Sequence, residues 1–284
     1  MALRSTRARV PAVVASDLDG TLLTSLGEVS PRSRRALVAV RAAGGHVVLA
    51  TGRPTRYVVD LARSLDLDTP VVCANGAVLY DARRDEVVAE RTLATRVVGE
   101  LGAALRARLP GVAFAVEGAR GFRCERRFAE HNEWPIPVDA VVDDEGWVDG
   151  EPVAKLLVRH PGLELGELLA AAGEVLDGQG EATYSSATLL EVAAPGVDKA
   201  AGLAEVVGAL GVEQGDVVAF GDMPNDIPML RWAGTGVAVA NAHREVRAVA
   251  DAVTASNDDD GVARDLEERL AAQQPRLAEG GRRG

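Results

Sequence analysis

Short apolar runs alternate with amphipathic segments at both ends of the chain, and this alternation constrains the fold more than any other feature. The β-branched runs at residues 10–15 and 46–50 are too short for helices, and residues 31–43 between them carry apolar side chains at helical spacing. The same pattern predicts a helix at 54–67 and strands at 70–74, 216–220, 236–239 and 252–254. It also predicts one helix that ends near 210, one that lies near 228–232 and one that begins at 244. The dipeptide Asn75-Gly76 predicts a hairpin turn. Strands that alternate with helices form a parallel sheet covered on both faces.

The middle of the chain interrupts this alternation. Residues 93–192 contain adjacent predicted strands and a stretch rich in proline and aspartate at 134–150. Within them, helices are expected at 93–109 and 164–176, and strands near 112–117, 121–126, 153–158, 183 and 189–192. We therefore predict an α/β protein with a Rossmann-like parallel-sheet core, residues 1–88 and 193–284, into which an α+β domain is inserted at residues 89–192.

Composition and charge exclude several classes of function. Of the 284 residues, 47% are hydrophobic and 26% are charged, so the chain can bury a core and is neither disordered nor fibrous. With 31 Lys and Arg against 42 Asp and Glu, the net charge of −11 repels nucleic-acid backbones and anionic membranes. No apolar window is long enough to span a membrane, and the apolar run after the basic N-terminus ends at Asp17 without an export signal. We expect a cytoplasmic protein that binds neither nucleic acid nor membranes, with Cys73 and Cys124 as free thiols. Its oligomeric state is not indicated.

Acidic side chains follow the first predicted strand. Asp17 and Asp19, in the run Asp-Leu-Asp-Gly-Thr, lie at the carboxyl end of that strand, where open α/β sheets bind ligands. Two carboxylates so close together repel each other unless a cation holds them or one keeps its proton. A calcium-binding loop would require glycine where Leu22 stands, and a solvated acidic turn is the simpler alternative.

Two cationic or anion-binding candidates occur further along the chain. The second predicted strand is followed by Thr51, Gly52 and Arg53. The hydroxyl of Thr51 and the backbone amides after it can therefore bind an anion at the same sheet edge. Lys199 begins a predicted helix and is the remaining candidate cation. Taken alone, each of these also fits an ordinary turn or a solvated lysine.

A second acidic segment follows the strand predicted at 216–220. Asp222, Asn225 and Asp226 supply two carboxylates and an amide within five residues. Acidic side chains at two strand ends of one sheet provide the oxygen ligands that a hard cation prefers. A helix-capping loop is the alternative interpretation.

The four segments, taken in this order, resemble the haloacid dehalogenase superfamily of phosphotransferases. The resemblance implies that Asp17 is the nucleophile and that Asp19 is the general acid/base, whose backbone carbonyl also binds Mg²⁺. It implies that Asp222 completes a metal site with Asp17 and Asp19. The residues implied to contact the substrate phosphate are Thr51, Gly52, Lys199 and Asn225, with Arg53 and Asp226 in supporting positions.

The spacing of these motifs is similar to that of one subgroup of the family. Thr51 follows Thr21 by only 30 positions, whereas Lys199 follows Arg53 by 146 positions. This resembles the Cof-like subgroup, whose cap domain is inserted between the second and third motifs. The segments beginning at residues 73, 198 and 257 also resemble that subgroup, whereas Met223-Pro224 stands where Gly-x is frequent.

The resemblance implies a Mg²⁺-dependent phosphomonoester hydrolase that acts through an aspartyl phosphate on a small phosphorylated metabolite such as a sugar phosphate. A phosphomutase with the same catalytic residues and a non-enzymatic receiver-like phosphoacceptor module are the alternatives. The inserted domain would be the cap. Its candidate leaving-group contacts, for which a solvated basic surface is the preferred interpretation, are Arg123, Glu125, Arg126, Arg127, His131, Trp134 and Glu191.

Overall fold

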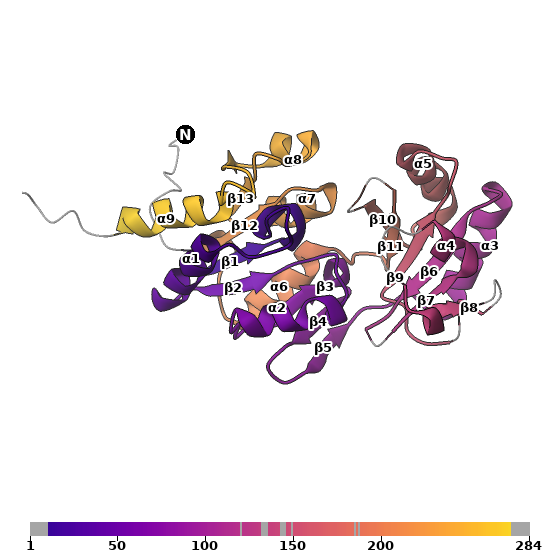
Figure 1. The fold of residues 1–284 in the computed structure, drawn as a ribbon, viewed down its shortest axis with the longest axis horizontal. Coiled ribbons are helices and arrows are strands. Elements are labelled where there is room, and N and C mark those ends of the chain that lie inside the picture. Colours follow the sequence, from indigo (N-terminus) through magenta and orange to yellow (C-terminus); the bar gives the residue numbers. More distant parts are fainter. Residues whose placement is uncertain are drawn as a thin grey trace, which may run out of the picture.

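The computed structural model describes residues 11–119, 121–131, 136–142, 146–148, 150–184, 186 and 188–273. Figure 1 shows two layered parts, one built from both ends of the chain and the other from its middle. None of the helices in these described ranges is long and apolar enough to cross a membrane.

A five-stranded parallel sheet lies at the centre of the part built from the chain ends. Its strand order is β14 (Ala252–Val253), β13 (Thr235–Ala238), β12 (Val217–Gly221), β1 (Val13–Ser16) and β2 (His46–Leu49). Val13 of β1 lies opposite both Val217 and His46, so β1 has a parallel neighbour on each side. The predicted parallel-sheet core is confirmed. Because β1 and β12 are adjacent, the acidic segments that follow them meet at one sheet edge.

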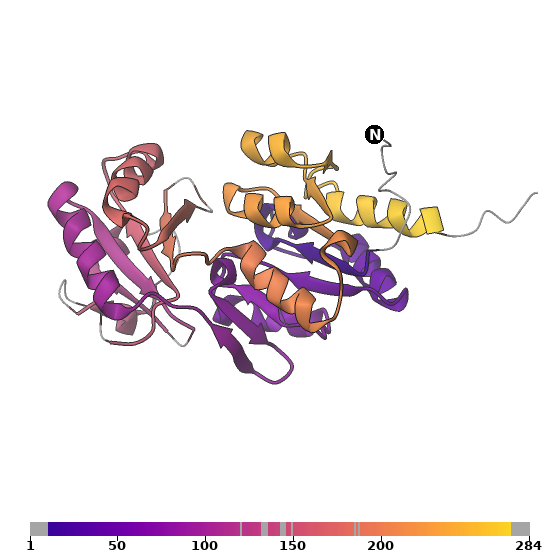
Figure 2. The ribbon, with the colours of Figure 1, turned by 180° about the vertical axis from the view of Figure 1, so that it is seen from behind.

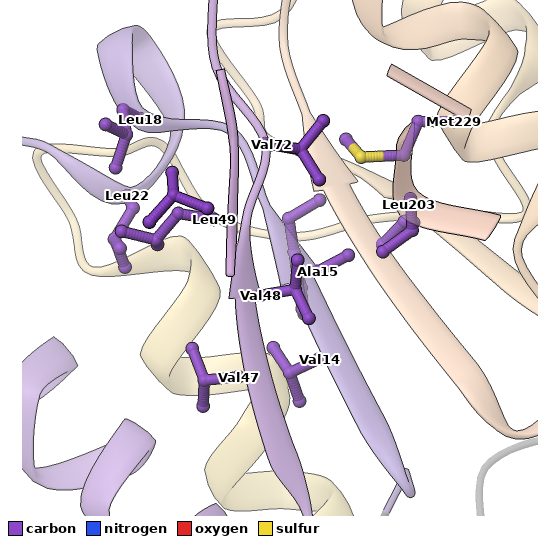
Figure 3. Packing of buried hydrophobic residues seen from close by; sticks show 14 of the residues in the cluster. Val14, Ala15, Leu18, Leu22, Val47, Val48, Leu49, Val72, Leu203 and Met229 are labelled. Atoms are coloured by element: carbon purple, nitrogen blue, oxygen red, sulfur yellow. The ribbon is translucent and has the colours of Figure 1, made fainter. Parts of the chain in front are cut away.

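Helices cover this sheet on both faces (Figures 1 and 2). Helix α1 (Pro31–Ala42) packs against α9 (Gly261–Gln273), and α6 (Lys199–Ala209) packs against α7 (Ile227–Trp232). Two further helices of this part are α2 (Val59–Ser64) and α8 (Arg244–Val249), which are as short as α7. Figure 3 shows Leu18, Leu22 and Leu49 on one side of β2, and Leu203 and Met229 on the other.

A hairpin extends the core sheet. Strands β3 (Val71–Cys73), β4 (Val78–Asp81) and β5 (Glu86–Glu90) form an antiparallel sheet, which a parallel bridge between Ala50 and Val72 joins to β2. The predicted turn is confirmed: Asn75 and Gly76 have φ of 58° and 96° between the paired strands β3 and β4. The sequence pattern does not predict β5, because its side chains are mostly exposed and lack apolar alternation.

The inserted part is a six-stranded sheet with helices on both faces. Its order is β10 (Glu181–Tyr184), β11 (Leu190–Ala193), β9 (Lys155–Arg159), β6 (Ala113–Glu117), β7 (Phe122–Glu125) and β8 (Val141–Val142), and only the β7–β8 pair is parallel. Helices α3 (Thr95–Arg108) and α5 (Leu165–Leu176) cover the face that includes Phe114, whereas α4 (Arg126–Glu130) buries Phe128 against the other face. The predicted α/β fold with an inserted α+β cap is confirmed. The sequence pattern does not predict α4.

Candidate active site

A buried lysine joins the segments that follow β1 and β12. Asp17 comes directly after β1, and its backbone N–H donates to the carbonyl of Phe220 in β12 at 3.0 Å. Lys199, the first residue of α6, donates from Nζ to Asp17 Oδ1 at 2.7 Å and to Asp226 Oδ1 at 2.6 Å. Lys199 and Asp226 are fully buried, and Asp17 is 5% exposed. One ammonium group thus bridges residues more than 200 positions apart.

Asp226 also shapes the loop after β12. Its Oδ2 accepts from the backbone N–H groups of Asp222 at 2.9 Å and Met223 at 3.0 Å, while its Oδ1 accepts from Lys199. Both carboxylate oxygens are therefore occupied, and the loop that carries Asp222 is held against the lysine. The sequence indicates a supporting role for Asp226, and these contacts place it inside the cluster.

Three carboxylates converge at this sheet edge. Asp17, Asp222 and Asp226 each offer an oxygen atom, and these atoms lie within 4.8 Å of one another. Thr21 Oγ1 donates to Asp222 Oδ1 at 2.8 Å. A Cβ on Gly20 would lie 2.4 Å from Asp222 Oδ2, so only glycine allows this approach. Three buried carboxylates against one ammonium leave an excess negative charge, which fits a hard divalent cation.

Burial perturbs the ionisation of these groups. Burial raises the pKa of Asp17 well above its usual value, and the carboxylates of Asp226 and Asp222 add to this against the opposing effect of Lys199. Burial also raises the pKa of Asp222 to about 6, with a further contribution from Asp226. For Lys199, burial alone would lower the pKa, but Asp17 and Asp226 raise it above the usual value, so the ammonium stays charged. Bound cations relieve this kind of carboxylate repulsion.

The side chain of Asp19 lies apart from this cluster. It is 59% exposed, and Arg53 donates to it twice, from Nε to Oδ2 at 2.7 Å and from Nη2 to Oδ1 at 2.5 Å. Among the described residues, the carboxylates close enough to share a metal include Asp17 and Asp222 but not that of Asp19. Any contribution of Asp19 to a metal in this arrangement would therefore come from its backbone.

A lysine of the inserted sheet reaches the loop after β2. Thr51 Oγ1 accepts from the backbone N–H of Arg53 at 3.0 Å, and the carbonyl of Gly52 accepts from Lys155 Nζ at 2.8 Å. Lys155 begins β9 and is 3% exposed. Sequence reasoning does not identify Lys155; its one local signal is a charged residue at the start of an apolar strand.

Two asparagines connect the fourth motif to the inserted sheet. Asn225 Nδ2 donates to Asn75 Oδ1 at 3.1 Å, and Asn75 Nδ2 donates to Glu191 Oε2 at 2.5 Å. All three residues are at most 6% exposed. Asn225 Oδ1 is buried and has no hydrogen-bond partner within the part of the chain that the structure describes. Of the cap candidates named from the sequence, Glu191 thus reaches the core.

The other cap candidates lie elsewhere. Glu125 is buried inside the insertion, where it pairs with Arg106 and accepts from the backbone N–H of Phe114 at 3.0 Å. The four remaining described candidates have exposed side chains: Arg123, Arg126, Arg127 and His131. Trp134 lies outside the described residues.

Comparison with known proteins decides the family. The family model described as haloacid dehalogenase-like hydrolase matches residues 14–266. The chain belongs to the haloacid dehalogenase-like hydrolases. The resemblance of its motifs to this family and to the Cof-like subgroup is confirmed, as is the prediction that it is an enzyme of the hydrolase class.

Curated and structural relatives of this haloacid dehalogenase-like hydrolase span almost its whole length. The chain is 34% identical to the 5-amino-6-(5-phospho-D-ribitylamino)uracil phosphatase YcsE of Bacillus subtilis, covering 89% of this chain and 93% of that protein. It is 31% identical to the pyridoxal phosphate phosphatase YbhA of Escherichia coli, covering 88% and 96%. The phosphatase BT1666 of Bacteroides thetaiotaomicron has a similar structure, with a TM-score of 0.78, 28% identity and coverage of 96% and 98%.

Proposed function

We propose that this hydrolase is a Mg²⁺-dependent phosphatase that cleaves small phosphomonoesters through an aspartyl phosphate on Asp17. The observation that carries the proposal is the contact of Asp17 with Lys199 in a buried site that also contains Asp222 and Asp226. A nucleophilic carboxylate needs nearby cations before a phosphomonoester dianion can approach it. The named phosphatases among its relatives support the same reaction class.

The acidic residues fit a magnesium ion. Asp17 and Asp222, with the backbone carbonyl of Asp19, would hold Mg²⁺. A further oxygen, Oδ1 of Asn225, belongs to the residue three positions after Asp222 and has no hydrogen-bond partner among the described residues. When bound, Mg²⁺ neutralises charge on the phosphoryl oxygens and on the attacking carboxylate. Asp226 is committed to Lys199 and to two backbone N–H groups, so we assign it to supporting the loop.

The two aspartates of the first motif take different steps. A carboxylate oxygen of Asp17 attacks phosphorus, the bond from phosphorus to the leaving oxygen breaks, and Asp19 protonates the departing alkoxide. Asp19 then accepts a proton from water, which attacks phosphorus and releases phosphate and the free Asp17 carboxylate. General acid/base catalysis of this kind contributes about 10² to 10⁴ in rate. The exposed position of Asp19 leaves its side chain accessible to a leaving group.

The phosphate is assigned to the residues around Lys199. Its ammonium and the hydroxyl of Thr51 would contact phosphoryl oxygens, with Gly52 beside them and Arg53 in support, whereas Asn225 would reach the phosphate through a bound metal ion or water. Nδ2 of Asn225 already donates a hydrogen bond to Asn75. In this arrangement the atom that Asn225 can offer to a ligand is therefore its Oδ1 oxygen. An oxygen serves a metal ion, a bound water or a substrate hydroxyl rather than a phosphate oxygen.

The inserted domain, residues 89–192, is proposed as the cap over a core made of residues 1–88 and 193–284. A cavity of about 400 Å³ lies between the two parts, with Leu169 and Tyr184 on the inserted side and Lys199, Asn225 and Ile227 on the other. We assign this cavity to the leaving group of the substrate. A sugar phosphate remains the proposed example of the substrate, and a cytoplasmic location remains a prediction.

A phosphate-release assay tests the proposal. The purified chain should release phosphate from a panel of phosphomonoesters in Mg²⁺, lose this activity in excess chelator, and regain it when Mg²⁺ returns. Phosphate transfer between sugar phosphates, measured in parallel, distinguishes a phosphomutase. A full panel without phosphate release or transfer would contradict the proposed function.

A further inference from the structure

We propose that the ion pair between Lys155 and Glu191, both in the inserted domain, sets the direction of the hydrogen bonds made by Thr51 and Asn225, so that Thr51 offers its proton to the phosphate and Asn225 offers an oxygen to the metal ion that would bind with it. The two residues lie on the neighbouring strands β9 and β11, with Lys155 Nζ 3.2 Å from Glu191 Oε1. Each is 3% exposed. The inference rests on the proposed function and adds two positioning residues to it.

The first chain of hydrogen bonds runs from Lys155 to Thr51. Lys155 donates to the carbonyl of Gly52, and the N–H of that same peptide unit belongs to Arg53 and donates to Thr51 Oγ1 at 3.0 Å. A cation on the carbonyl polarises the peptide and strengthens its N–H as a donor. Because Thr51 Oγ1 accepts this bond, its own proton is left to donate outward. A phosphate oxygen is the kind of group that accepts it.

The second chain runs from Glu191 to Asn225. An ionised carboxylate can only accept hydrogen bonds, so Glu191 requires Asn75 to present its NH₂ group. The side-chain oxygen of Asn75 then faces Asn225, so Asn225 must donate to it from its own NH₂ group. Asn225 is left with its Oδ1 atom, which is buried and has no hydrogen-bond partner among the described residues. One carboxylate thereby fixes the orientation of two side-chain amides.

An ion pair between the two parts provides a matched control. Arg56 follows the same loop of the core and binds Glu117 of β6 through Nη1 at 2.5 Å and Nη2 at 2.8 Å. Glu117 lies directly opposite Lys155 in the β6–β9 register, so the Arg56–Glu117 pair and the Lys155–Gly52 contact join the same sheet to the core. The hydrogen bonds of the Arg56 pair end on Glu117 and do not continue to Thr51 or Asn225. Both would contribute to the contact between the parts, but only the Lys155 contact would affect phosphate.

The experiment compares Lys155→Met, Glu191→Gln and Arg56→Met in the full-length chain. Binding of inorganic phosphate is measured by calorimetry with Mg²⁺ present, together with kcat, KM and the melting temperature. Lys155→Met should weaken phosphate binding about tenfold, the effect of losing one charge-assisted hydrogen bond. Glu191→Gln, which keeps the shape and lets Asn75 and Asn225 turn over, should weaken phosphate binding several-fold at subsaturating Mg²⁺, because Asn225 then presents an NH₂ group in place of the oxygen that a metal ion requires. Arg56→Met should change it less than twofold, although its melting temperature falls.

A double-mutant cycle with Thr51→Val tests the route of the effect. If Lys155 acts through the Thr51 hydroxyl, Lys155→Met should weaken phosphate binding less than twofold in the Thr51→Val background. Additive losses, or equal losses for Lys155→Met and Arg56→Met, would overturn the inference and make the pair an ordinary contact between the parts. If Lys155→Met does not fold, equal phosphate binding by Glu191→Gln and the unmodified chain overturns it. A wild-type chain that neither binds nor releases phosphate contradicts the proposed function instead.

Discussion

Asp17 and Asp19 lie two positions apart in the sequence, yet their carboxylates occupy opposite surroundings. Asp17 is 5% exposed and accepts from the buried Lys199 at 2.7 Å. The Asp19 side chain is 59% exposed and accepts hydrogen bonds from Nε and Nη2 of Arg53. A buried carboxylate beside a fixed cation suits attack on phosphorus, whereas an exposed one can exchange protons with a leaving group and with water.

This separation predicts different defects in two isosteric variants. Asp17→Asn should abolish turnover of every phosphomonoester, because no nucleophile remains. Asp19→Asn keeps the nucleophile and loses proton transfer, so it should release up to one equivalent of p-nitrophenol from p-nitrophenyl phosphate and then stall. Alkyl phosphates, whose leaving groups need a proton, should give no burst.

Rapid-quench kinetics on both variants check this prediction. Linear turnover by Asp19→Asn at the wild-type rate, or a burst from Asp17→Asn, would show that the two roles are assigned to the wrong residues. Melting curves of the two variants provide the control for folding.

Removing a carboxylate from the cluster should weaken metal binding more than folding. In the unmodified chain, Mg²⁺ at about 100 times its dissociation constant should stabilise the fold by about 2.7 kcal/mol, because the ion binds only the folded state. Asp222→Asn should abolish most of this shift, since it removes one of the carboxylates that can share an ion. Thermal melting in chelator measures the stability of the metal-free fold, and melting in Mg²⁺ measures the stabilisation that the ion adds. Full enzymatic activity in excess chelator is the result that rules out metal dependence.

Two glycines with the same backbone conformation should respond differently to alanine. Gly20 and Gly27 both have φ of +76°, but a Cβ on Gly20 would lie 2.4 Å from Asp222 Oδ2, whereas a Cβ on Gly27 would have no described residue other than its chain neighbours within 4 Å. Gly27→Ala should cost about 1 kcal/mol of unfolding free energy from the backbone alone. Gly20→Ala should cost more and should also displace Asp222.

Urea unfolding and Mg²⁺ titration of both alanine variants provide the measurement. Equal losses of stability with unchanged Mg²⁺ affinity in Gly20→Ala would show that the loop moves freely away from Asp222.

The two cysteines should be inert in the native protein. Both are fully buried, and burial raises the pKa of Cys73 to about 12 and that of Cys124 to about 11. Since the thiolate is the reactive form, an aromatic disulfide reagent at pH 8 should react slowly with the native chain and rapidly with two equivalents in denaturant. One rapid equivalent under native conditions would place a thiol at the surface.

Local sequence patterns determined most of the architecture and the identity of the central residues. The strands beside Asp17 and Asp222 are short β-branched runs whose burial shows in their composition, so the sheet and the residues at its edge could be predicted. Strand β5 and helices α4 and α9 could not be predicted in this way. Strand β5 is mostly exposed, α4 has only five residues, and α9 has charged residues between its apolar ones.

The tertiary structure alone decided how the polar side chains pair. Nothing near Lys155 in the sequence indicates that it reaches the Gly52 carbonyl, 103 positions earlier, and the contact of Asn75 with Glu191 spans 116 positions. Local sequence also does not predict the separation of the Asp19 side chain from that of Asp17, because it depends on the hydrogen bond from Arg53 in the loop after β2. Apolar periodicity is a local property of the chain, whereas a buried hydrogen bond depends on which donors and acceptors the packed sheets bring within about 3 Å of each other.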